Sequence, residues 1–176
     1  MTKEERIQAF KQLLGDFVDD IDSLTDNLDD VGFFTAPAST KYHRNWEGGL
    51  FDHSYQVALK LVDMTAKMKL RWDDNRSPIL VGFLHDICKC DAYIKTMYGS
   101  YSYNKKQTLA GHGDKSVILL QSLMRLTEEE ILCIRYHMGA YEGENVWSNF
   151  GESISRYPNV LWTHTADMYA THVIGV

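Results

Sequence analysis

The chain has 176 residues, a length that suits one domain with a sizeable hydrophobic core. Its composition, 44% hydrophobic and 24% charged, excludes a disordered chain, and no apolar run reaches the ~18 residues that a membrane-spanning helix needs. The net charge of −6 argues against a broad basic surface for long nucleic acid, but it leaves open a small anionic substrate held by bound divalent cations.

Cysteine usage and the start of the chain both bear on cellular location. Cys88, Cys90 and Cys133 are odd in number, which fits a reduced protein better than a disulfide framework. The first six residues are charged and no apolar segment follows them, so they do not resemble a secretory signal. We therefore expect a cytoplasmic protein with no membrane partner.

The pattern predicts an all-α fold, a single helical bundle over residues 1–176 whose first 30 residues form two helices packed on the core. Thr2 and Glu5 form a capping-box pattern, and apolar residues then recur at helical spacing. These apolar residues are Ile7, Phe10, Leu13, Leu14 and Phe17. Residues 16–30 form a second amphipathic stretch, whose acidic residues we assign to a solvated outer face.

The next part of the chain predicts a loop and two helices. Glycine, proline and small polar residues indicate a loop over 31–47, and a helical apolar pattern follows over 50–68. The Ser-Pro pair at 77–78 has the pattern of an N-cap and first helical residue. The helix that it starts is apolar on nearly all sides, so we expect it to be central and buried, with His85 and Asp86 in its C-terminal half.

The second half predicts further helices and two irregular stretches. Residues 91–107 contain four tyrosines and predict a loop or short hairpin over one side of the site. Helices are expected over 116–124 and from a second capping box at Thr127 to His137. Residues 140–157 are interpreted as an irregular lid or substrate wall, and the last helix begins at the proline that follows.

A His-Asp pair follows the most apolar stretch of the chain. His85 and Asp86 come directly after residues 79–84, and Lys89 comes shortly afterwards. A buried carboxylate without a partner costs several kcal/mol or is forced to protonate, so a bound cation is one of the few ways for Asp86 to stay ionised there. The pair by itself is weak evidence, because such dipeptides occur by chance.

Other potential metal ligands stand in separate helices or at helix ends. Together with the pair, the candidates are His53, His85, Asp86, His112, His137 and Asp167. Helical bundles build metal sites from inward residues on several helices, and this mixture of imidazole and carboxylate suits Mn²⁺, Fe²⁺, Co²⁺, Ni²⁺ or Zn²⁺. Each residue alone also has an ordinary structural role as its alternative. Jointly, however, six such ligands with one bridging carboxylate are enough for two metals.

Five short motifs occur in a fixed order along the chain. They are Gly48-Gly49-Leu50-Phe51-Asp52-His53-Ser54, Phe83-Leu84-His85-Asp86-Ile87-Cys88-Lys89, Gly111-His112, Tyr136-His137 and Ala166-Asp167. In this order they resemble the HD superfamily of metal-dependent phosphohydrolases. The chain is most similar to the stand-alone HD hydrolases and to the HD domain of bacterial exoribonucleases, and the resemblance spans about residues 43–170.

The resemblance implies a role for each candidate. The core metal ligands of the family match His53, His85, Asp86 and Asp167. Asp86 would bridge two ions, and His112 and His137 match the histidines that hold a second metal in binuclear members. Lys89 matches a lysine that faces the substrate phosphate.

Two features depart from the family pattern. Cys88 stands where glycine is common, and we expect it to pack in the core instead of binding metal. The N-terminal oligonucleotide-binding barrel of the exoribonucleases has no counterpart in these residues, which makes a polynucleotide substrate less favoured.

The resemblance implies a metal-dependent phosphohydrolase in which a metal-activated hydroxide attacks phosphorus. Asp86 and Lys89 are the catalytic candidates, and Lys89 and Arg44 are the candidates for substrate contact. The favoured partner is a small phosphorylated substrate, a nucleotide or short oligonucleotide. The alternatives are a cyclic-nucleotide or alarmone phosphodiesterase and a non-catalytic HD-like signalling module. Outward-facing aromatic residues leave an oligomer open.

Several further residues are candidates for supporting roles. Asp114 and His164 are candidates for an acid that supports the site from outside the ligand set. The tyrosines of 91–107 and Trp147 are candidates for stacking on a nucleobase, with packing in the core or lid as the alternative.

Overall fold

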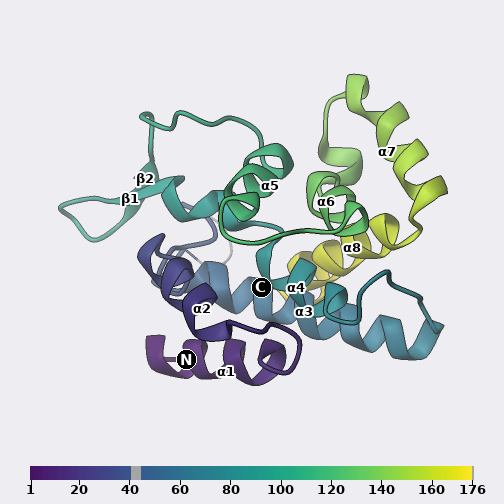
Figure 1. Ribbon diagram of the computed structural model, residues 1–176. Helices are drawn as coiled ribbons and strands as arrows, with labels where there is room; N and C mark the ends of the chain where they lie inside the picture. The colour runs from purple at the N-terminus through teal and green to yellow at the C-terminus, as the bar shows by residue number, and fades with distance from the viewer. Residues whose placement is uncertain (41–44, 176) are drawn as a thin grey trace.

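The computed structural model describes residues 1–40 and 45–175, and the chain there is mostly helical, as the sequence predicted. The α-helices are α1 (Lys3–Leu14), α2 (Ile21–Asp30), α3 (Gly49–Met68), α4 (Ser77–Leu84), α5 (Gly113–Gln121), α6 (Glu128–Arg135), α7 (Glu144–Arg156) and α8 (Asn159–Tyr169). The smaller elements are the 3-10 helices η1 (Ile87–Asp91) and η2 (Gly139–Tyr141), the strands β1 (Tyr93–Lys95) and β2 (Tyr101–Tyr103), and the π-helix η3 (Ala170–Ile174). In Figure 1, α3 and α4 lie centrally, while the β1–β2 hairpin and α7 project on opposite sides. None of the helices in the described part of the chain combines the length and apolarity needed to cross a membrane.

Helices α3 and α4 form the centre of the bundle. Every residue of α4 is buried, as its uniformly apolar sequence predicted. Gly82 of α4 lies against the backbone of α3, where an added Cβ would come 2.3 Å from Ala58 Cα. Because glycine has no side chain, the two helices approach each other directly at this point. This contact sets the spacing between His53 on α3 and His85, which caps the end of α4.

Buried phenylalanines join the N-terminal helices to this centre. They are Phe10, Phe33, Phe34, Phe51 and Phe83. Phe10 of α1 meets Phe83 of α4 edge-on, with 5.1 Å between ring centroids, and Phe33 and Phe34 pack beside them after the end of α2. Each such pair contributes about 0.5–1.5 kcal/mol beyond the area that it buries.

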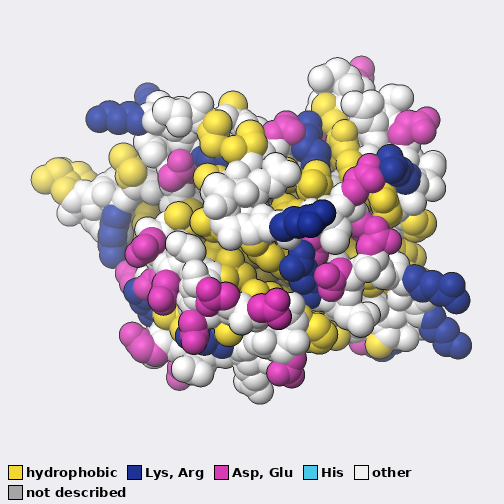
Figure 2. Space-filling view, viewed as in Figure 1, with side chains coloured by type: hydrophobic (Ala, Val, Ile, Leu, Met, Phe, Trp, Pro, Cys, Tyr) yellow, Lys and Arg dark blue, Asp and Glu magenta, His cyan; other side chains and the backbone are white. Residues whose placement is uncertain are grey.

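The acidic outer face predicted for residues 16–30 is confirmed. Its exposed members are Asp16, Asp19, Asp20, Asp22, Asp26 and Asp30. In Figure 2, acidic side chains gather over the corner of the molecule that α1 and α2 occupy. Phe17, which the sequence assigned to the apolar stripe of the first helix, lies beyond the end of α1 and is exposed.

A buried ion pair, which no local pattern predicted, links α1 to the start of α3. Arg6 is 5% exposed, and its guanidinium donates to Asp52 Oδ1 at 3.1 Å. It also donates to the carbonyl oxygens of Phe34 at 3.3 Å and Glu47 at 3.1 Å. Gly48, with φ of 79°, leaves room for it, since a Cβ there would come 2.0 Å from Arg6 Cζ. The pair therefore fixes the residue directly before a predicted metal ligand.

The prediction that residues 140–157 are irregular was wrong, whereas their role as a lid or substrate wall stays a prediction. Most of this stretch forms α7, which follows the short turn η2. Trp147, Phe150 and Ile154 recur at helical spacing, and the last two pack against the hydrophobic core. Polar residues and one glycine stand between these apolar residues, so the helical spacing was not recognised in the sequence.

Several helix boundaries also differ from the prediction: α2 begins only at Ile21, α5 ends at Gln121 and α6 ends at Arg135. The central helix ends at Leu84, so His85 and Asp86 follow α4 instead of lying within its C-terminal half. Helix α5 begins at Gly113, three residues before the predicted start. Capping residues explain the helix starts that were predicted well, because the boxes at Thr2 and Thr127 are both present.

We predict that Gly82→Ala lowers the free energy of unfolding by about 1–3 kcal/mol, because the added methyl group meets the α3 backbone, which has no side chain to move aside. The control is Gly151→Ala on α7, where nothing lies within 4 Å. It should raise stability by about 0.5–1 kcal/mol, the helix preference of alanine over glycine. Urea denaturation measures both, and equal stability of the two variants would contradict close packing at Gly82.

We predict that Arg6→Ala lowers the free energy of unfolding by about 3–5 kcal/mol, because it leaves the Asp52 carboxylate buried without this partner. The matched control is Lys3→Ala on the same helix, whose ion pair with Asp29 is partly exposed and should contribute little. Chemical denaturation of both variants tests this, and a loss below about 1 kcal/mol for the Arg6 variant would argue against a structural role for the pair.

Candidate metal centre

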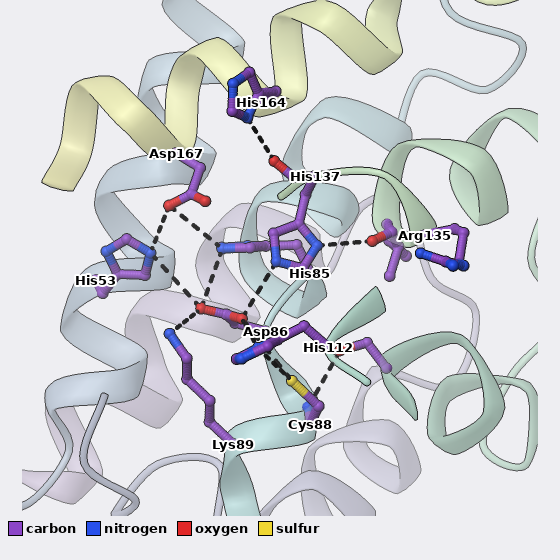
Figure 3. A network of polar contacts seen from close by, with 12 residues as sticks. His53, His85, Asp86, Cys88, Lys89, His112, Arg135, His137, His164 and Asp167 are labelled. Carbon is purple, nitrogen blue, oxygen red and sulfur yellow. Dashed lines mark hydrogen bonds and ion pairs between the residues drawn. The ribbon is translucent and has the colours of Figure 1, made fainter. Parts of the chain in front are cut away.

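Six side chains that the sequence predicted as metal ligands converge in the structure (Figure 3). They are His53 of α3, His85 and Asp86 between α4 and η1, His112 directly before α5, His137 just after α6, and Asp167 of α8. All are buried except His112, whose side chain is 47% exposed. We call these six residues the Asp86 cluster. Their role as metal ligands stays a prediction.

The two carboxylate oxygens of Asp86 face different neighbours. Oδ1 lies 3.4 Å from His137 Nε2 and 3.6 Å from His112 Nδ1. Oδ2 lies 3.6 Å from His85 Nε2 and 4.0 Å from His53 Nε2. One carboxylate thus stands between two sets of imidazole nitrogens, the arrangement that a bridging ligand requires.

Asp167 closes the cluster on the side of α3. Its Oδ1 lies 3.1 Å from His53 Nε2 and 4.0 Å from His85 Nε2. Lys89 adds a cation, with Nζ 2.6 Å from Asp86 Oδ2. The Asp86 cluster therefore consists of two carboxylates and four imidazoles, and the Lys89 ammonium group lies directly beside it.

Backbone carbonyl groups orient two of the imidazole rings. His85 Nδ1 donates to the Gly82 carbonyl at 2.9 Å, and His137 Nδ1 donates to the Ile134 carbonyl at 2.7 Å. Each ring consequently presents Nε2 to the cluster, and among the described residues these two buried Nε2 atoms have no hydrogen-bond partner. A buried polar atom left in this way costs about 1–3 kcal/mol. Coordination of a cation satisfies such atoms, and a backbone-bound Nδ1 is the usual support of a histidine ligand.

Both carboxylates of the cluster are held ionised. Burial by itself favours the neutral acid, but the Lys89 ammonium and the surrounding imidazoles outweigh it and hold the pKa of Asp86 well below its usual range. Burial of Asp167 is outweighed chiefly by its hydrogen bond with His53, so its pKa is also lowered. Because both carboxylates are anionic at neutral pH, together they attract a cation strongly.

The basic groups respond to these carboxylates in different ways. Burial lowers the pKa of His85 to about 4, so its imidazole is neutral at pH 7. The nearby Asp86 carboxylate raises the pKa of His112 to about 10, and against the effect of burial Asp86 also raises the pKa values of His137 and Lys89. A metal ion that binds here therefore competes with protons already attracted by Asp86.

The donor atoms fit a divalent metal. Donor atoms form three groups, and within each group all of them lie within 4.8 Å of one another. The groups are His53, His85 and Asp86; His85, His137 and Asp167; and Asp86, Cys88 and His112. Imidazole and carboxylate donors in such mixtures bind first-row transition metals and zinc. The described residues thus include groups that can hold a metal.

An apolar pocket of about 260 Å³ opens beside the cluster. It is bounded by Ala38, Ser39, Met138, Tyr141, Met168 and Thr171. His53, Asp86, Lys89 and Asp167 form its polar end. A molecule in this pocket therefore has an apolar surround on one side and the charged cluster on the other.

A second pocket, of about 280 Å³, opens on the other side of Lys89 and is more polar. Its lining includes Tyr93, Tyr103, Asn104, Lys105, Gln107 and Lys115, and His112 lies at its edge with the cluster. The β1–β2 hairpin, one of the two forms predicted for residues 91–107, supplies the two tyrosines, which pair across the strands. Lys89 belongs to the walls of both pockets, so it stands where a ligand in either one approaches Asp86.

The other predicted residues lie at varying distances from this centre. Arg44 falls outside the described residues. His164 Nδ1 donates to the His137 carbonyl at 2.8 Å, and Asp114 forms an ion pair with Arg135. Neither is a member of the Asp86 cluster, so each acts at most through a neighbour. Trp147 hydrogen-bonds to the Glu142 carbonyl and is absent from the described walls of both pockets.

Sequence reasoning missed the contributions that have no motif. Met138, Met168 and Thr171 shape the apolar pocket although each has the pattern of an ordinary packing residue. The carbonyl groups of Gly82 and Ile134 orient the rings of His85 and His137 through the backbone, which carries no sequence signal beyond the three-residue spacing to each histidine.

Comparison with known proteins gives one partial relationship. No family model matches the chain, and no solved structure matches it. A curated protein of Methanocaldococcus jannaschii, dihydroneopterin 2′,3′-cyclic phosphate phosphodiesterase, is 38% identical over 72 residues. The match covers 39% of this chain and 28% of that protein, so the chain spans only a small part of its relative.

We predict that Mn²⁺, Co²⁺, Ni²⁺ or Zn²⁺ raises the melting temperature of chelator-treated protein, because an ion that binds only the folded state adds about 2.7 kcal/mol at a hundred times its dissociation constant. In Asp86→Asn this increase should disappear, since the shared oxygens of the cluster lose their charge.

The control is Asp63→Asn, an equally small change on the exposed face of α3, which should keep the full increase. Differential scanning fluorimetry with and without each metal gives the readout. An increase of equal size in both variants would show that metal binds somewhere other than the Asp86 cluster.

Proposed function

We propose that this protein is an HD-type metal-dependent phosphohydrolase that cleaves a phosphate ester of a small nucleotide-like substrate. The observation that carries the proposal is the position of Asp86, whose two carboxylate oxygens face separate sets of imidazole nitrogens within one buried cluster. The partial relationship to a phosphodiesterase supports hydrolysis of phosphate esters from independent evidence.

In this proposal the residues of the cluster hold one or two divalent ions. His53, His85 and Asp167 lie on the Oδ2 side of Asp86, and His112 and His137 lie on the Oδ1 side. A bound metal supplies Lewis acidity, which lowers the pKa of a coordinated water toward ~7 and polarises a phosphoryl oxygen. The backbone contacts of His85 and His137 keep the rings in place without adjustment during the reaction.

Lys89 holds positive charge where the phosphate enters. Its ammonium contacts Asp86 Oδ2 and borders both pockets, so a phosphate in either pocket approaches it. In the hydrolysis, the oxygen of water forms a bond to phosphorus, the bond from phosphorus to the leaving oxygen breaks, and the proton released from water ends on the leaving oxygen. Lys89 offsets the negative charge that gathers on the phosphate during this exchange.

The two pockets support a substrate with an organic group attached to the phosphate. Tyr93 and Tyr103 offer aromatic faces and Lys105 offers a cation on the polar side, features that suit a nucleotide. The net charge of −6 disfavours long nucleic acid, so a mononucleotide or short oligonucleotide is the proposed substrate class.

A cyclic phosphodiester is the second candidate. The curated relative acts, by its name, on a 2′,3′-cyclic phosphate, and the apolar pocket beside Asp86 and Lys89 offers apolar walls to the ring system of such a substrate. Both candidates use the same phosphate position, and they differ in whether the product remains one molecule or separates into two.

We predict hydrolysis of at least one member of a panel of mononucleotides, nucleoside triphosphates, dinucleotides, 2′,3′- and 3′,5′-cyclic nucleotides and guanosine polyphosphates, assayed with Mn²⁺, Co²⁺ and Ni²⁺. Chromatography of the products separates the classes of substrate. Asp86→Ala should reduce kcat/KM by more than about 100-fold, beyond the effect expected for a residue that merely supports a ligand.

Lys89→Ala is expected to keep metal binding while lowering kcat by about 10²-fold, because it removes charge stabilisation and leaves the ligand set intact. Asp63→Asn should behave like the unmodified protein. A protein that binds metal yet hydrolyses no member of the panel would favour the alternative of a non-catalytic signalling module.

A further inference from the structure

Cys88 differs from the other two cysteines in its surroundings. Cys133 belongs to the hydrophobic core, and Cys90 packs against it from the side. Cys88 is 4% exposed, yet its neighbours are polar: Sγ lies 3.5 Å from His112 Nδ1 and 3.9 Å from Asp86 Oδ1. The expectation that Cys88 packs in the core therefore does not account for where its sulfur points.

The backbone fixes this orientation. Cys88 lies in η1, two residues after Asp86, and its N–H donates to Ser116 Oγ of α5 at 3.2 Å. Figure 3 shows its sulfur on the same side of Asp86 as His112. A thiol beside a carboxylate and an imidazole is poised for coordination, since the thiolate is one of the strongest ligands for zinc and similar ions.

The spacing of the donor atoms matches a metal site. Ligands at 2.0–2.3 Å from a tetrahedral zinc ion stand about 3.3–3.8 Å apart. Asp86 Oδ1, Cys88 Sγ and His112 Nδ1 are 3.5 to 3.9 Å apart in their three pairs. His137 points Nε2 at the same carboxylate oxygen from 3.4 Å, and that buried nitrogen has no hydrogen-bond partner within the described residues.

We propose that Cys88 is a metal ligand, so that the ion on the Oδ1 side of Asp86 is held by sulfur, nitrogen and oxygen together. On binding, a metal–sulfur bond forms and the thiol proton leaves to solvent, with no change of oxidation state. The inference rests on the proposed metal centre and is independent of the substrate.

A sulfur ligand changes which metal the site prefers. Thiolate favours Zn²⁺, Co²⁺ and Fe²⁺ over the harder Mn²⁺ and Mg²⁺, which prefer oxygen. The ion on the Oδ1 side should therefore bind zinc and cobalt more tightly than manganese, whereas the site formed by His53, His85 and Asp167 should discriminate less.

The test is an anaerobic titration of reduced, chelator-treated protein with Co²⁺, followed by absorption spectroscopy. A cobalt–thiolate bond gives a charge-transfer band in the near ultraviolet that nitrogen and oxygen ligands do not give. Cys88→Ser should bind cobalt without this band and lose at least about tenfold in affinity for one equivalent, since even residues that only support a ligand cost 10–100-fold. Cys90→Ser is the matched control in the same 3-10 helix and should keep both the band and the affinity.

X-ray absorption at the zinc edge of the unmodified protein provides a measurement that needs no variant. One sulfur at about 2.3 Å from the metal is expected. The inference is overturned if cobalt binds without the band, if the band survives in Cys88→Ser, or if the zinc spectrum contains no sulfur. Absence of all metal binding would instead overturn the metal centre itself, which distinguishes the two failures.

Discussion

The negative charge of Asp86 in the interior is the constraint on which the rest of the site depends. A carboxylate that is removed from water must be compensated, and here it lies between four imidazoles and the Lys89 ammonium. Each of these partners comes from a chain segment whose position is fixed by other contacts. The packing of the bundle therefore also determines how the charge of Asp86 is compensated at its centre.

Helix ends supply most of the cluster. His85 caps α4, His112 caps α5, and His137 follows the end of α6 by two residues. At such ends the chain leaves the regular hydrogen-bond pattern, so backbone carbonyl groups become available to side chains. His85 and His137 each donate to the carbonyl oxygen three residues earlier, so the same backbone contact orients the imidazole ring in two separate segments. This geometry explains how a fold of short helices brings imidazole and carboxylate groups together without a rigid sheet.

The sequence predicted the parts of this structure that follow from local rules. Capping boxes at Thr2 and Thr127 and the uniformly apolar α4 were recognised because short-range spacing alone determines them. The six members of the Asp86 cluster were found because buried ionisable groups are rare and their motifs occur in order. Interactions that depend on distant segments escaped: nothing near Arg6 indicates that it pairs with Asp52, 46 positions away.

Other failures have a physical reason as well. Helix α7 was mistaken for a loop because its apolar stripe is narrow and its packing partners lie elsewhere in the chain. The pocket walls came from residues such as Met138 and Met168, whose side chains look the same in a core and beside a ligand. The position of Cys88 beside His112 and Asp86, on which the proposed coordination rests, likewise depends on distant segments and carries no signal in the sequence.

The contact between Gly82 and Ala58 has a consequence for how this protein changes over evolution or in the laboratory. Because backbone meets backbone there, no bulky side chain separates the helices that carry His53 and lead to His85 at their closest approach. The phenylalanine core can exchange one shape for another of similar volume while the two histidines keep their separation. A single residue without a side chain thus separates variation of the core from the spacing of these two histidines.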